Sequence, residues 1–148
     1  MYHFDTYGIS FKISKNWKVV DIIDSPDFKE GTIFFALNNN DNFSIFIKDY
    51  KGKNYQELYE ENIKQLKLSG FKIEAENNFT TLNNKDINLC NIKLDENTYM
   101  LSAFLNIKDE MFCNIYITFE GDFNIKKKEF FKVLNSIKPF CSINHQDN

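Results

Sequence analysis

The sequence YGISFKISKNWKVV at residues 7–20 contains two short alternating stretches separated by a break. Ile9, Phe11 and Ile13 alternate with polar residues, which is the period of a strand with one buried face. The break is followed by Trp17, the single tryptophan of the chain, whose large ring can close the end of a core. The segment therefore predicts a strand, a break and a second strand, with Trp17 as a core residue.

Length and composition are those of one globular domain rich in β-structure. The chain has 148 residues, of which 43% are hydrophobic and 26% are charged. The 16 Phe and 7 Tyr favour a sheet, because aromatic rings pack well on a pleated surface. All 18 basic residues are Lys, a bias typical of low-GC bacterial genomes, so the side chain best suited to bidentate phosphate recognition is missing. Together with a net charge of −3, this argues against nucleic-acid binding.

The expected location is the cytoplasm. No run of apolar residues is long enough for a transmembrane helix, so no membrane span is predicted. Residues 1–5 lack the basic and apolar regions of a secretory signal.

The rest of the pattern predicts strands and two helices. Asn54 with Glu57 three residues later forms a capping box, and Gly70 supplies a stop, so a helix is expected between them. A second helix is expected over residues 125–137, ending before Pro139. The predicted strands cover residues 2–4, 9–13, 18–23, 32–37, 43–48, 71–76, 79–82, 87–94, 99–107 and 111–120. Short polar connections between the strands in the second half of the chain require neighbouring strands to be antiparallel. The alternation of apolar residues changes phase near Cys90, which suggests a β-bulge there.

Four apolar side chains lie on the face of this meander that would normally be polar. They are Met100, Phe104, Phe112 and Tyr116. Such residues either lie beneath a second layer, which is the favoured interpretation, or line an exposed binding surface. They are the candidate binding residues of this chain.

Residues typical of catalysis and metal binding are sparse. The two histidines, His3 and His145, lie near opposite ends, and the three cysteines, Cys90, Cys113 and Cys141, form no C-x-x-C pair. No P-loop or G-x-G-x-x-G motif occurs. We therefore predict no catalytic residue, no metal site and no cofactor, and the chain is not expected to be an enzyme.

Three consecutive lysines at residues 126–128 crowd the first turn of the second predicted helix, against its dipole. They are either a basic patch for an acidic partner or a solvated face in a lysine-rich chain. The second interpretation is favoured.

Two short signatures resemble the PsbP-like superfamily, whose fold is shared with the eukaryotic Ran-binding nuclear import factor. The first is Gly8-x-Ser10-Phe11 followed by Trp17, and the second is a closing helix with Phe-x-x-Leu-x-Ser-Ile at residues 131–137. A proline common before the tryptophan segment is absent here, as is the secretion signal of many bacterial relatives. The resemblance implies an α+β fold, an antiparallel β-sheet flanked by helices in an α-β-α sandwich.

The resemblance also implies a class of function. The superfamily is mostly non-enzymatic, and some cytoplasmic bacterial relatives are adaptor chaperones that hold apolar segments of secreted toxins on a sheet face. No ligand residue of these relatives matches this sequence. The first hypothesis is a non-catalytic protein-binding or adaptor module whose partner is another protein of unknown identity, and a homodimer is left open. The alternative is a small-molecule or lipid-binding domain with a pocket between sheet and helix.

We expect one PsbP-like domain at residues 1–140 and a polar tail at residues 141–148.

Overall fold

The computed structural model describes residues 2–6, 9–22, 31–107 and 111–139, with side chains described from residue 10 to residue 138 within these ranges. The predicted tail at residues 141–148 lies outside them. In chain order the elements are β1 (Tyr2–Thr6), β2 (Ile9–Ile13), β3 (Lys18–Val19), β4 (Thr32–Asn38), β5 (Asp41–Asp49), α1 (Tyr55–Leu68), β6 (Lys72–Thr80), β7 (Asp86–Lys93), β8 (Thr98–Ile107), β9 (Met111–Glu120), α2 (Phe123–Asn135) and β10 (Lys138–Pro139).

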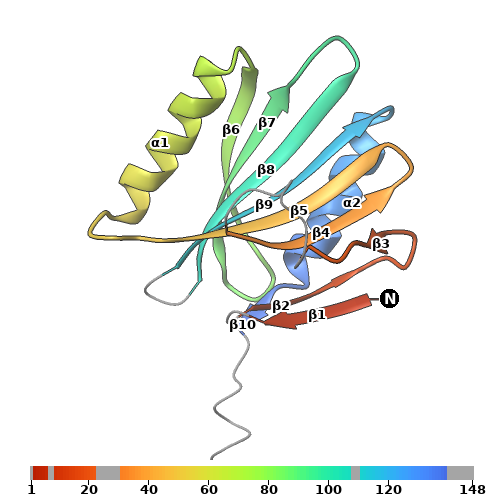
Figure 1. Cartoon of the computed structure of the whole chain (residues 1–148), viewed down its shortest axis with the longest axis horizontal. Coiled ribbons are helices and arrows are strands. Elements are labelled where there is room, and N and C mark those ends of the chain that lie inside the picture. Colours follow the sequence, from red (N-terminus) through yellow and green to blue (C-terminus); the bar gives the residue numbers. More distant parts are fainter. Residues whose placement is uncertain (1, 7–8, 23–30, 108–110, 140–148) are drawn as a thin grey trace, which may run out of the picture.

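The described strands form one large sheet and one small sheet. The large sheet has seven strands in the order β3-β4-β5-β9-β8-β7-β6, and every neighbouring pair is antiparallel. The small sheet has the order β1-β2-β10 (Figure 1). The tight β4–β5 turn uses Asn39 at φ 56°, a conformation that asparagine tolerates better than most residues.

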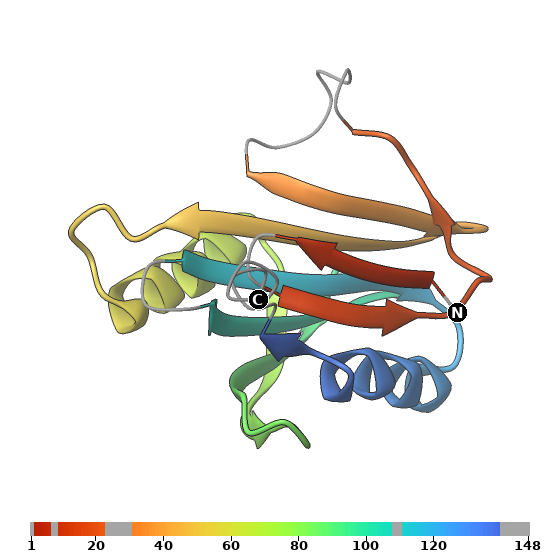
Figure 2. The same cartoon turned by 90° about the horizontal axis from the view of Figure 1, so that it is seen from below.

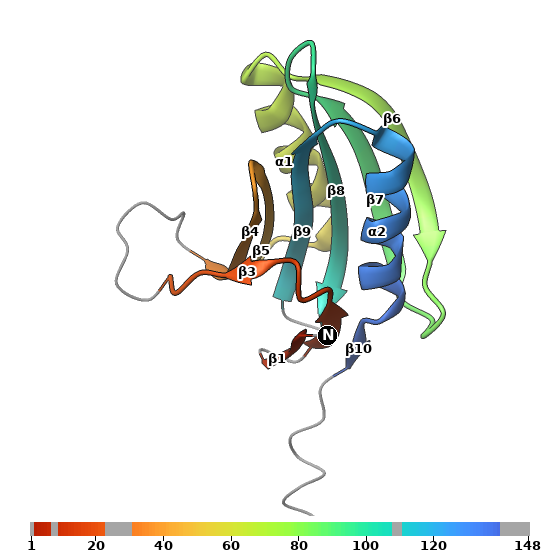
Figure 3. The ribbon, with the colours of Figure 1, turned by 90° about the vertical axis from the view of Figure 1, so that its right-hand side faces the viewer.

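The two helices lie on opposite faces of the large sheet (Figure 3). One face is covered by α2 together with the small sheet, whose central strand β2 lies between β1 and β10 and contacts α2 (Figure 2). The other face carries α1, which packs over β6, β7, β8 and the start of β9. This arrangement confirms the predicted α+β class and the α-β-α sandwich.

Trp17 is a core residue, as predicted. It is 3% exposed and packs edge-on against Phe43, with ring centroids 5.9 Å apart. Phe11 of β2 packs in the same way on Phe34 of β4, at 5.4 Å. Aromatic pairs of this kind contribute about 0.5–1.5 kcal/mol beyond the area they bury. The strand-break-strand segment therefore fastens the small sheet to the large one.

Each helix begins directly after its N-capping residue. α1 begins after Asn54, as predicted, and Gly70 at φ 85° follows its end. α2 begins two residues earlier than predicted, because the Asp122 side chain accepts hydrogen bonds from the backbone of Asn124 and Ile125. It ends at Asn135, before the proline, as expected.

Three strand predictions were wrong. The strand predicted over residues 18–23 is the two-residue β3, and residues 20–22 lie outside it. The bulge expected near Cys90 is absent from β7, whose pairing with β8 is continuous. The alternation of apolar and polar residues is interrupted at Cys90 because both faces of β7 are buried. Leu89 points toward α2 and Cys90 points toward α1. The irregularity lies instead in the neighbouring β6, between Ile73 and Ala75, and β6 is one strand where two were predicted.

Candidate functional site

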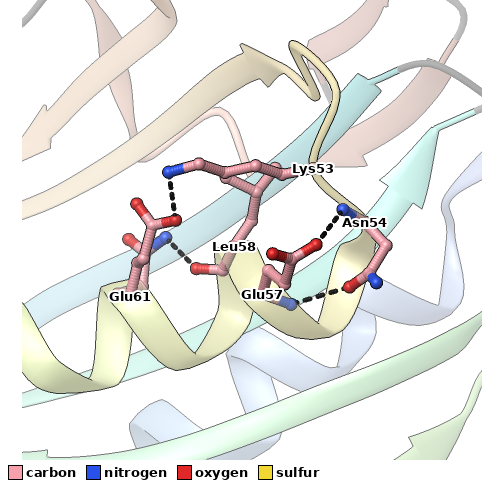
Figure 4. Close-up of polar contacts among 6 residues, drawn as sticks. Lys53, Asn54, Glu57, Leu58 and Glu61 are labelled. Carbon is pink, nitrogen blue, oxygen red and sulfur yellow. Dashed lines mark hydrogen bonds and ion pairs between the residues drawn. The ribbon is translucent and has the colours of Figure 1, made fainter.

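α1 is fixed at its N-terminus by polar contacts that the sequence encodes locally (Figure 4). The Asn54 side chain accepts a hydrogen bond from the Glu57 backbone at 2.9 Å, and the Glu57 carboxylate accepts one from the Asn54 backbone at 3.0 Å. Lys53 forms an ion pair with Glu61 at 2.6 Å, and this hydrogen bond lowers the pKa of the Glu61 carboxyl. These contacts determine the residue at which α1 begins. They therefore also determine which of its later side chains face the sheet.

The apolar stripe of α1 packs on half of the sheet face. Leu58, at 1% exposed, packs with Phe104 and Phe112. The Tyr55 hydroxyl lies 2.6 Å from the Asn88 side-chain oxygen and 2.8 Å from the Phe104 carbonyl, and burial raises the pKa of Tyr55. Tyr55 therefore remains a neutral donor that ties α1 to β7 and β8.

The rest of the face, over β4, β5 and the part of β9 that carries Asn114 and Tyr116, lies beside α1 and carries polar groups. Strand register aligns Ser44, Tyr116 and Ser102 in one row across β5, β9 and β8. The Asn114 amide nitrogen donates to the Ser102 hydroxyl at 2.7 Å and to the Ala103 carbonyl at 3.0 Å. The sheet therefore changes from an apolar surface under α1 to a mixed polar and aromatic surface beside it.

A groove runs along this boundary, and we call it the α1 groove. It consists of a cavity of about 550 Å³ over β5 and a cavity of about 220 Å³ over β8 and β9. Asn62 and Gln65 of α1 line both cavities and form the common wall. The smaller cavity has a floor of Met100, Phe104 and residues of β9, so the groove combines amide side chains with an apolar floor.

The structure brings three of the four candidate binding residues together. Met100, Phe104 and Tyr116 line the smaller cavity, where Met100 and Tyr116 are half-buried and Phe104 is 1% exposed. Phe112 is fully buried under α1, with its ring 5.5 Å from that of Tyr55. Phe104 and Phe112 therefore lie beneath a covering layer, as the favoured interpretation expected. Met100 and Tyr116 lie at the edge of that layer.

Sequence reasoning missed the helical wall of the groove. Asn62, Gln65 and Ser69 are neutral polar residues at spacings of three and four on a helix whose other polar positions are mostly Glu and Lys. They adjoin the apolar stripe, and this neutral strip was the signal that could have identified them.

A cluster on the far flank of α1 holds ionisable groups close together. The Tyr59 hydroxyl lies 2.5 Å from a Glu76 carboxylate oxygen and 3.5 Å from the Cys90 sulfur. Burial raises the pKa of both Tyr59 and Cys90, so the thiol stays protonated and is a poor nucleophile. The contacts tie α1 to β6 and β7.

Within the ranges that the structure describes, no three His, Cys, Asp or Glu side chains are grouped so that they could hold a metal ion. None of the described helices is long and apolar enough to cross a membrane.

Comparison with known proteins identifies the fold. No protein-family model matches the sequence, and no curated protein matches it. The chain is similar to the solution structure of cyanobacterial PsbP (CyanoP) from Synechocystis sp. PCC 6803, with a TM-score of 0.69 and 10% identity over 94% of this chain and 92% of that one. It is also similar to the Saccharomyces cerevisiae Ran-binding protein Mog1p, with a TM-score of 0.59 and 9% identity over 93% of this chain and 94% of that one. The chain therefore has a PsbP-like fold, as the two sequence signatures indicated.

Proposed function

We propose that this protein is a non-catalytic binding module, and that its α1 groove receives an extended segment of another protein. The observation that carries the proposal is the boundary where α1 leaves half of the sheet face uncovered. That boundary is lined by Asn62 and Gln65 on one side and by Met100 and Tyr116 on the other. Mog1p, which shares the fold, is a Ran-binding protein, which supports a protein as the partner.

The amide side chains of the groove suit a peptide backbone. Among the described residues, Gln65 makes no side-chain hydrogen bond, so its two donors and one acceptor remain available. Asn62 donates to the Leu58 carbonyl at 2.9 Å, and the hydrogen bonds of Asn114 described above use its amide nitrogen. Each keeps an amide oxygen that can accept from a peptide N–H. A peptide in the groove could therefore pair its backbone polar groups, as desolvation requires.

The apolar floor would supply the remaining affinity. Met100 is flexible and adapts its shape to different side chains, which is typical of surfaces that accept varied partners. Phe104 below it is held by the contacts with α1. One apolar side chain of the partner over the half-buried Met100 would bury it more deeply, while Phe104 is already buried beneath it.

A photo-crosslinking experiment tests the proposal. Ser69, at the end of the groove, is replaced by p-benzoylphenylalanine and the protein is irradiated in cells of its source. A discrete adduct with another protein is expected, and Gln65→Arg should weaken its formation roughly tenfold by filling the groove with a charge. Gln56→Arg is the matched control, because Gln56 lies on the opposite flank of α1. Equal capture by both variants, or no adduct, would contradict the proposal.

A small-molecule ligand is the second candidate, because the cavity lies between sheet and helix. The part lined by Met100, Phe104 and Tyr116 is about 220 Å³, below the range of roughly 300–1,000 Å³ typical of ligand pockets, whereas the part over β5, about 550 Å³, lies within that range. Native mass spectrometry of the purified protein separates the candidates, because a bound molecule lost in Gln65→Arg would favour the ligand. The same proposal includes an adaptor role, a cytoplasmic location and a homodimer. Cell fractionation tests the location, and analytical sedimentation of the purified protein tests the homodimer.

A further inference from the structure

α2 lies on the opposite face of the sheet from α1 (Figure 3). A second groove is lined by side chains of α2. We call it the α2 groove. It has a volume of about 870 Å³ and runs along α2 between the end of β2 and the turn that joins β6 to β7. Its floor includes Val133, which is 4% exposed, and Ser136.

Two large aliphatic side chains are exposed in the α2 groove. Leu82 is 82% exposed and Ile125 is 64% exposed. The position of Leu82 is fixed, because its backbone N–H donates to the Asn135 side chain at 3.0 Å. The adjacent Asn83 side chain donates to the carbonyls of Asn135 and Ile137, at 3.2 Å and 3.0 Å. The fold therefore holds an exposed leucine in a defined place at the end of α2.

The charge of the α2 groove is opposite to that of the whole chain. Lys12, Lys128 and Lys132 line it, and none of them forms an ion pair with a carboxylate among the described residues. Glu129 also lines it, but one of its carboxylate oxygens is buried and lies 4.0 Å from the amine of Lys126, outside the groove. The net charge of the chain is −3, so this concentration of lysine is local.

The three lysines of residues 126–128 have separate environments. Lys126 pairs with Asp41 at 2.7 Å and lies over the Trp17 ring, and Lys127 lies over the rings of Phe123 and Phe131. Lys128 alone of the three lines the α2 groove, four residues before Lys132. Like charges at this spacing on a helix repel each other, and a bound anion between them would relieve the repulsion.

We infer that the α2 groove docks an acidic amphipathic segment of a partner protein. Apolar side chains of that segment would cover Leu82, Ile125 and Val133, and its carboxylates would pair with the lysines. An anionic membrane is the competing occupant, but a flat bilayer surface does not match a concave site whose floor is the buried Val133. Because the two grooves lie on opposite faces, this site is independent of the α1 groove, and both could be occupied at once.

Selection from a library of random displayed peptides tests the inference with the full chain as bait. Selected peptides should be enriched in Asp and Glu together with Leu, Ile or Phe. The double substitution Lys128→Glu and Lys132→Glu should weaken their binding roughly tenfold or more, since like charges then face each other. Leu82→Ser should weaken it as well, without a change of charge. The matched control is Lys64→Glu with Lys67→Glu, a double charge reversal on α1.

The outcomes are distinct. Selected peptides without acidic enrichment, or with equal affinity for the groove variant and the control variant, would overturn the inference. Binding to phosphatidylglycerol vesicles that is lost in the groove variant, with no peptide binding, would assign the surface to a membrane and overturn it too. Circular dichroism of each variant confirms that the fold is retained, and Leu82→Ser provides a second variant that leaves α2 unchanged.

Discussion

Replacing Gly31 by alanine should destabilise the protein through a backbone contact that glycine alone permits. Gly31 has φ 95°, and a Cβ built there would lie 2.4 Å from the Ile47 carbonyl oxygen and 2.8 Å from the Phe46 ring. An L-residue at such a φ costs roughly 1–2 kcal/mol. Relieving the contact would displace the Ile47 N–H from its hydrogen bond to the Gly31 carbonyl, now 2.9 Å, at a further cost of about 1–3 kcal/mol. The expected loss in the free energy of unfolding is about 2–5 kcal/mol.

Gly52 supplies the matched control. It has φ 82°, but a Cβ there would meet nothing within 4 Å, so Gly52→Ala should show only the backbone cost of roughly 1–2 kcal/mol. Urea unfolding followed by the fluorescence of the buried Trp17 measures both variants. The midpoint for Gly31→Ala should fall clearly below that for Gly52→Ala at an unchanged slope. Equal midpoints would refute the reasoning, because the contact at Gly31 would then have no energetic effect.

Three further predictions concern the cap, a turn and the buried thiols. Asn54→Ala should lower the free energy of unfolding by about 1 kcal/mol, because it removes the capping box of α1. Urea unfolding that shows no such decrease would contradict a stabilising role of this cap. Backbone hydrogen bonds to the Asp95 carboxylate hold the pKa of Asp95 below the unfolded value of about 3.9. The ionised carboxylate therefore stabilises the fold above about pH 3.9, and this stabilisation is lost as the pH falls through the pKa of the folded state. The stability difference between the native protein and Asp95→Asn should therefore shrink in acid, and a constant difference in thermal melts across pH would exclude this role. Cys90 and Cys113 are buried with raised pKa values, so in a Cys141→Ser background neither should react with Ellman's reagent until urea unfolds the chain, and rapid native reaction would argue against their burial.

The local features of the fold could be predicted because neighbouring residues determine them. The start of α1 follows from Asn54 and Glu57 alone, and the core position of Trp17 follows from its place after an alternating strand. The position of Cys90 was harder, because burial on both faces of β7 imitates a bulge in the sequence pattern. Periodicity reports which side chains are apolar, but it does not report how far a helix extends over a sheet.

The candidate site shows the same limit. Met100, Phe104, Phe112 and Tyr116 were selected because they are apolar on a face that is expected to be polar. Their different burial depends on where α1 crosses the sheet, which long-range packing decides. The wall residues of the groove were missed because a neutral strip beside an apolar stripe is a weak signal until the structure shows which surface the strip faces.

The pairing of β10 with β2 has a consequence for how the chain folds during synthesis. Lys138 and Pro139 pair with Ser10 and Ile9, and the Ser136 hydroxyl accepts a hydrogen bond from the Lys12 backbone across 124 residues of sequence. These contacts cannot form until the end of α2 and β10 have left the ribosome. Contacts at such separation slow folding, because loop closure must precede any gain from them. β2 is synthesised early, but it has no β10 to pair with, and the large sheet has no α2 to cover one of its faces, until residues 123–139 have been made.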